Sequence, residues 1–185
     1  MSSTDKISNW FREYEVSRSA IAERLGINNR APTWVMENAV ELATHGLDPI
    51  REHFGIPVSP QSWFRCEELE KVLTWEKGFR FWCAQRTLPW ITRQHLYKNM
   101  GAQTSWDRYF ERKSHPKGMA VDIEIAGISN DVLFDWIKEH LEFDQLIREF
   151  PQPSDPTSGW VHMSWAGVQC NRNVYFSIPY YDKYA

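Results

Sequence analysis

The sequence predicts an α+β fold, with helical segments first and then strands joined by a helix. Two patterns indicate this order: apolar residues recur at helical spacing over residues 33–54, whereas residues 119–125 alternate between apolar and polar side chains. The 185 residues suffice for a single domain, expected over residues 1–185, with one insertion. With 42% hydrophobic residues and no apolar run long enough to cross a bilayer, we expect a soluble protein without stable membrane insertion.

Helices are expected in the N-terminal part of the chain. Residues 17–25 predict a short helix that ends at Gly26. Residues 33–54 predict a longer helix, broken near Gly46 and Pro49, and Gly55 is expected to end it. Two helical segments are therefore expected before the first strand.

A second helical region is expected in the middle of the chain. Residues 56–64 contain two prolines and predict an extended segment that leads to Arg65. Residues 66–113 are mostly helical in pattern and rich in tryptophan. We interpret 66–113 as a helical insertion in the single domain, and the sequence leaves open whether it selects substrate or is a passive addition.

Strands are expected in the C-terminal part. In residues 119–125 the polar positions include Asp122, which predicts a strand with one solvent-facing side. Residues 129–141 predict an amphipathic helix, and strands are expected near residues 144–150 and 160–165. The prediction thus gives three strands after the insertion.

Charge and cysteine content exclude some classes of protein. The 21 Lys and Arg residues against 24 Asp and Glu residues argue against a nucleic-acid partner bound through counterion release. Cys66, Cys83 and Cys170 lie far apart, so we expect buried free thiols and no disulfide framework. No signal peptide is recognisable at the N-terminus, which predicts synthesis in the cytoplasm.

The clearest chemical pattern is a spaced set of metal-ligand residues. His115 precedes Gly118, which permits a turn, and Asp122 follows on the polar face of the next expected strand. His162 lies on a later strand, where it can reach the same place. A single histidine on a strand is more often structural, but two imidazoles and a carboxylate together are a three-ligand Zn²⁺ set with room for water.

These residues resemble the zinc D-Ala-D-Ala carboxypeptidases and their phage relatives, the L-Ala-D-Glu endolysin peptidases. The matching segments are HPKGMAVD (115–122), FDQLIREF (143–150), GWVHMSW (159–165) and SWFR (62–65). The resemblance implies a small antiparallel sheet flanked by helices, as in the hedgehog and D-Ala-D-Ala peptidase fold. It also implies that His115, Asp122 and His162 hold Zn²⁺ as the cofactor.

The resemblance also implies roles for residues around the metal. Some members of the family carry a catalytic Glu three residues before the last histidine, but Gly159 stands there, so Glu149 is the expected general base and Asp144 the alternative. Arg65 is expected to bind substrate or to stabilise the oxyanion. Trp160 is expected either in a cleft wall that binds substrate or in the core.

The resulting hypothesis is a zinc metallopeptidase that hydrolyses an amide in the peptide stem of bacterial peptidoglycan. We expect a phage-encoded monomer made in the host cytoplasm that reaches the cell wall after release or delivery, either as an endolysin or on the virion. The alternative is a non-catalytic phage structural or wall-binding module with the same fold. The residues leave open which amide bond is cleaved.

Overall fold

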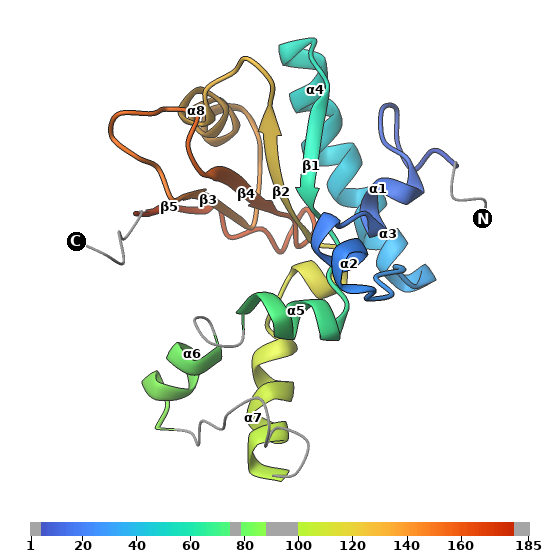
Figure 1. Cartoon of the computed structure of the whole chain (residues 1–185). Helices are drawn as coiled ribbons and strands as arrows, with labels where there is room; N and C mark the ends of the chain where they lie inside the picture. Colours follow the sequence, from blue (N-terminus) through green and yellow to red (C-terminus); the bar gives the residue numbers. More distant parts are fainter. Residues whose placement is uncertain (1–4, 75–78, 88–99, 180–185) are drawn as a thin grey trace.

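The computed structural model describes residues 5–74, 79–87 and 100–179, and over these residues the fold is α+β, as predicted (Figure 1). The helices before the insertion are α1 (Glu13–Ser17), α2 (Ala20–Leu25), α3 (Thr33–Leu42), the π-helix η1 (Ala43–Leu47) and α4 (Asp48–Phe54). The others are α5 (Glu67–Thr74), α6 (Arg80–Gln85), α7 (Met100–Phe110), the 3₁₀ helix η4 (His115–Lys117) and α8 (Asn130–His140). The strands are β1 (Val58–Ser62), β2 (Ala120–Ile125), β3 (Gln145–Glu149), β4 (Trp160–Ser164) and β5 (Val174–Ile178).

The five strands form one mixed sheet in the order β1-β2-β4-β3-β5. The pairs β1–β2, β2–β4 and β3–β4 are antiparallel, whereas β5 runs parallel to β3. The expectation of an antiparallel sheet therefore holds for four strands, and it missed β5. Asn173 holds the start of β5 next to β3 through two hydrogen bonds to Phe143. The backbone N–H of Asn173 donates to Phe143 O (2.9 Å), and its side-chain Oδ1 accepts from Phe143 N (3.0 Å).

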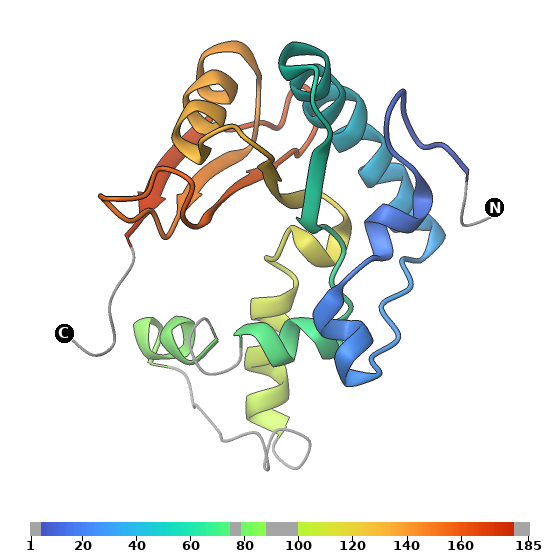
Figure 2. The same ribbon diagram turned by 45° about the horizontal axis from the view of Figure 1, so that its top comes forward.

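One face of the sheet packs on helices. Figure 2 shows α3, α4 and α8 on one side of the sheet and α5, α6 and α7 on the other. The apolar positions of the strands bury against the first group, at about 1.5–3 kcal/mol for each large side chain. This core includes Val121, Ile123, Leu146, Val161 and Met163 from the strands and Ala39, Leu42, Leu47, Ile50, Leu133 and Ile137 from the helices.

The predicted break in the helix over 33–54 is a π-helical turn. α3, η1 and α4 follow one another without a loop, and Pro49 lies in the first turn of α4. Proline has no N–H to donate, and the π-turn tolerates the missing hydrogen bond, so the helix continues through it. The helix ends at Gly55, as predicted.

Most of the described residues of the insertion are helical, and they form a small core of their own. Trp106 is fully buried and packs edge-on against Phe79, with ring centroids 5.2 Å apart. Its Nε1 donates to Glu67 Oε1 (2.8 Å), which ties α7 to α5. The other buried apolar residues described in the insertion are Leu69, Cys83 and Tyr109. Residues 75–78 and 88–99 of the predicted insertion lie outside the described residues.

Two expectations about exposure are corrected. The polar face of β2 is not open to solvent, since Asp122 is only 6% exposed between its neighbouring strands. The three cysteines are free, as expected, but only Cys83 is buried, whereas Cys66 is half-buried and Cys170 exposed. Among the described helices, none has both the length and the apolar character needed to cross a membrane.

Candidate metal centre

Strands β2 and β4 bring Asp122 and His162 together. The two residues are directly opposite in the antiparallel register, so their side chains project from the same face of the sheet. His162 Nδ1 lies 2.8 Å from Asp122 Oδ1. This face is the one turned away from α3, α4 and α8, because the alternate residues of both strands are in the core.

His115 reaches the same carboxylate from the 3₁₀ helix before β2. Its Nε2 lies 3.3 Å from Asp122 Oδ1. Gly118 closes this helix with a φ of 72°, and a Cβ at that position would lie 2.7 Å from Val35 O on α3. Glycine is therefore needed both for the left-handed turn and for the close approach that places His115.

A main-chain contact fixes the tautomer of His115. His115 Nδ1 lies 2.7 Å from Trp63 O, and a carbonyl oxygen can only accept a hydrogen bond. Nδ1 therefore carries a proton, and in the neutral ring Nε2 is then the nitrogen whose lone pair is available to a metal ion. Such a partner on the outer nitrogen is the usual support of a metal-ligating histidine.

Together, His115, Asp122 and His162 form a compact group of three potential ligands. One ligand atom from each lies within 4.8 Å of the others, and the residues are only 7%, 6% and 8% exposed. Ligand bonds of about 2.0–2.2 Å place the ligand atoms of a tetrahedral Zn²⁺ site roughly 3.3–3.6 Å apart. With small side-chain shifts the group could hold an ion through three protein ligands, which would leave a fourth position for water or substrate.

The charge state of this group suits a cation. Burial acts to raise the Asp122 pKa, but His115, His162 and Arg65 together hold that pKa well below its usual range. Burial lowers the pKa of His115, and the charge of Arg65 lowers it further against the opposing effect of Asp122. A carboxylate and a neutral imidazole are the ligand forms that metal ions require.

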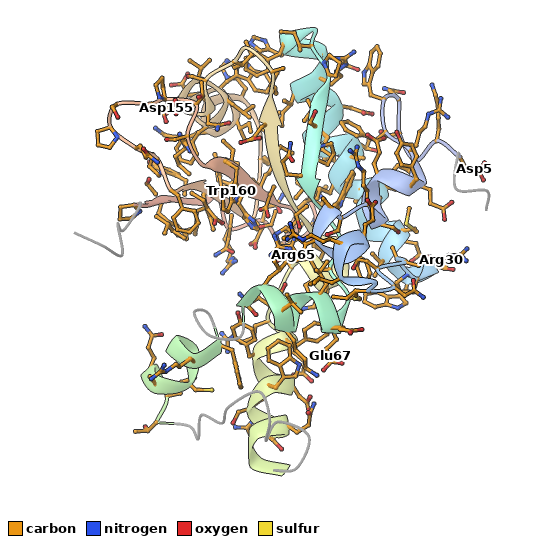
Figure 3. The ribbon with its side chains drawn as sticks, in the orientation of Figure 1. Asp5, Arg30, Arg65, Glu67, Asp155 and Trp160 are labelled. Atoms are coloured by element: carbon orange, nitrogen blue, oxygen red, sulfur yellow. The ribbon has the colours of Figure 1, made fainter. Side chains whose placement is uncertain are left out.

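Arg65 lies at the edge of the cluster, where the chain passes from β1 into α5; Figure 3 shows its side chain at this junction. Its Nη2 donates to Asp122 Oδ2 and its Nε donates to Ser62 Oγ (2.7 Å). Its Nη1 lies 3.6 Å from Glu70 Oε2. The structure thus places the predicted arginine in contact with a predicted metal ligand.

Glu149 projects from the same face of the sheet as His162. It is opposite Trp160 in the β3–β4 register, two positions along β4 from His162. Burial raises the pKa of Glu149, and the negative charge of Asp122 raises it further, against the opposing charges of His162, Arg65 and Lys113. A carboxylate with a raised pKa beside a metal site has the properties of a general base.

Gly159 leaves no room for a side chain three residues before His162. Its φ is 64°, and a Cβ at this position would overlap the carbonyl oxygen of Glu149. The chain therefore admits only glycine three residues before His162. The carboxylate that the resemblance implies has to come from another strand, and Glu149 is the acidic side chain that β3 presents on this face.

The other two predicted residues differ in placement. Trp160 is half-buried on the cluster face and packs edge-on against Phe150, with ring centroids 5.1 Å apart. Its buried Nε1 has no hydrogen-bond partner among the described residues. Asp144, the alternative base, is instead held in a bidentate ion pair by Arg172, with contacts of 2.6 and 2.7 Å.

Two residues of the site were not predicted. Trp63 orients His115 through its main-chain carbonyl, and a main-chain contact of this kind cannot be predicted from the residue type. Glu70 faces Arg65 from within the insertion and is 1% exposed. Its position three residues before Leu73, on the apolar side of α5, was the available signal that this acidic residue is buried.

Comparisons with family models, with curated proteins and with solved structures find no match to this chain. The likeness to zinc peptidases therefore depends on the short motifs given above, and membership of that family stays a prediction. The three-residue group is established as an arrangement of side chains, and its function is proposed below.

Proposed function

We propose that this protein is a zinc-dependent peptidase that hydrolyses an amide bond in the peptide stem of bacterial peptidoglycan. The observation that carries the proposal is the convergence of His115, Asp122 and His162 on one buried face, with Glu149 beside them. A purely structural cluster has no need of a further carboxylate on the same face with a raised pKa.

The chemistry follows from the side chains around the site. A Zn²⁺ ion held by His115, Asp122 and His162 would polarise a substrate carbonyl and lower the pKa of bound water to roughly 7. Glu149 accepts the proton of the attacking water and returns it to the departing amine, which needs a carboxylate whose pKa lies nearer neutrality than usual. Arg65, at the edge of the cluster, donates to a substrate carboxylate or to the oxyanion.

Peptidoglycan is the proposed substrate because the motifs resemble those of enzymes that act on its peptide stem. The guanidinium of Arg65 suits this substrate, since stem peptides carry free carboxylates. We further propose a phage-encoded monomer, made in the host cytoplasm, that reaches the wall on lysis or with the virion. Nucleic acid is not a proposed partner, because the chain carries a formal charge of -3.

Dye release from labelled bacterial cell walls tests the proposal. We expect purified protein to contain about one zinc per chain and to release dye, and a chelator should stop release until zinc is restored. Mass spectrometry of products from defined muropeptides then identifies the bond. Protein that binds zinc tightly but leaves every muropeptide intact would favour a non-catalytic wall-binding module. Protein that binds no zinc would overturn the proposed function.

A further inference from the structure

Glu70 is a buried carboxylate in α5, the first helix of the insertion. It is 1% exposed, and its Oε2 makes no hydrogen bond to any described residue. The nearest ion-pair contact of Oε2 is with Arg65 Nη1, at 3.6 Å. Since a buried carboxylate is costly unless a charge compensates it, Arg65 is the group that makes this position tolerable.

Arg65 is divided between three acceptors on three segments. Its Nε faces Ser62, its Nη2 faces Asp122 and its Nη1 faces Glu70. The planar guanidinium can satisfy all three at once, because its donors diverge in a fixed fork. Glu70 is the only one of these contacts that comes from the insertion.

A cation at the cluster has to share Asp122 with Arg65. The guanidinium is always charged, so its proximity opposes the entry of a divalent ion. A second carboxylate at the other terminal nitrogen of the guanidinium offsets that charge and gives Arg65 an anchor that does not depend on Asp122. Glu70 occupies this position, with side-chain exposures of 15% for Arg65 and 1% for Glu70.

We propose that Glu70 is a positioning residue that holds the Arg65 guanidinium at the edge of the cluster and offsets its charge, so that Asp122 can bind a divalent cation. The insertion then forms part of the metal centre. This inference rests on the cation site of the proposed function. It adds a role for Glu70, a residue to which the proposed function assigns none.

Zinc affinity measured by competition with a chromophoric chelator is the first test. Glu70→Gln keeps the size of the side chain and removes the charge, and we expect it to weaken Zn²⁺ binding by roughly 10- to 100-fold. The matched control is Glu68→Gln, which makes the same charge change at an exposed position of α5 and should leave the affinity unchanged. Equal affinities for both variants would overturn the inference.

A conservative variant separates charge from shape and covers the case in which Glu70→Gln does not fold. Glu70→Asp keeps the carboxylate, so we expect its Zn²⁺ affinity to stay within about threefold of wild type. A loss in Glu70→Asp as large as that expected for Glu70→Gln would show that packing, and not charge, matters at this position. That outcome would also overturn the inference.

The position of Arg65 can be measured without a metal. In protein labelled with ¹⁵N-arginine, the Nε–H signal of Arg65 is the one lost in Arg65→Lys. We expect its exchange with solvent to accelerate severalfold in Glu70→Gln and not in Glu68→Gln. An unchanged signal would overturn the positioning role. Wild-type protein without zinc affinity would overturn the proposed function and the charge-offsetting role, while this signal would still decide whether Glu70 positions Arg65.

Discussion

The two faces of the sheet are built from the same strands and perform different tasks. Along β4, Val161 and Met163 are fully buried against the helices, whereas Trp160 and His162 project toward the cluster. The difference arises from the period of two residues in a strand, which separates neighbours onto opposite faces. Neighbouring residues on one strand can therefore be changed to test stability and metal binding separately.

The largest expected effect is on the cluster face. His162→Ala removes one of the three proposed ligands, so we expect loss of zinc and a fall in wall hydrolysis of more than about 10⁴-fold. Metal content and dye release measure both. Hydrolysis at the wild-type rate would contradict the site assignment, and Met163→Ala, one residue away on the opposite face, is the control.

Glu149→Gln is expected to separate metal binding from turnover. Without a carboxylate to accept the proton of water, turnover should fall about 10²- to 10⁴-fold while zinc is retained. Steady-state rates on muropeptides and metal analysis of the same sample measure the two effects. Undiminished turnover would assign the base to another residue.

Glu149 also gives a pH dependence of stability whose sign is fixed. Burial raises its pKa in the folded protein. The protonated form therefore stabilises the fold at low pH, and this contribution is lost as the pH rises through the folded-state pKa. Glu149→Gln should therefore be more stable than wild type at neutral pH, with the difference vanishing in acid. Urea denaturation of both proteins over a pH series measures this, and a variant less stable at neutral pH would contradict it.

On the helix-covered face, substitutions should affect stability alone. Met163→Ala leaves a cavity against η1, where the Met163 side chain packs at Gly46, and we expect a loss of about 2–5 kcal/mol in the free energy of unfolding. Urea denaturation measures this loss, and zinc content should stay at the wild-type level. Loss of zinc from folded Met163→Ala would show that the two faces are not independent.

The smallest effect is expected at the start of α8. The Oγ of Ser129 accepts from Val132 N (3.2 Å) and caps the helix, so Ser129→Ala should cost about 1 kcal/mol. Thermal unfolding checks this value, and Ser129→Asn should restore it. A change in zinc affinity in folded Ser129→Ala would again link the helix-covered face to the cluster.

Periodic patterns predicted most of the fold. The helix over 33–54, the strand at 119–125 and the helix after Ser129 were visible because each buries one regular face. β5 was missed, because its side chains are largely exposed and its pairing with β3 depends on a loop contact at Asn173. Long-range pairing of this kind has no local signal.

Residue types and spacing also located the cluster. His115, Asp122 and His162 were predicted together and are together. Asp122 was expected to face solvent, because alternation along a strand shows which face of the sheet a residue lies on but not whether that face is covered. The partners Trp63 and Glu70 were not found, since one acts through its main chain and the other packs from an insertion.

Trp63 contacts the short helix that carries His115 through both its main chain and its side chain. Its carbonyl oxygen accepts a hydrogen bond from His115 Nδ1, and its indole N–H donates to Gly118 O (3.1 Å) at the other end of the same short helix. Truncating this side chain would release the second attachment but leave the first, because a main-chain acceptor survives substitution. Two hydrogen bonds therefore tie the segment that carries Arg65 to the turn that carries His115, and one of them should survive any substitution of the Trp63 side chain.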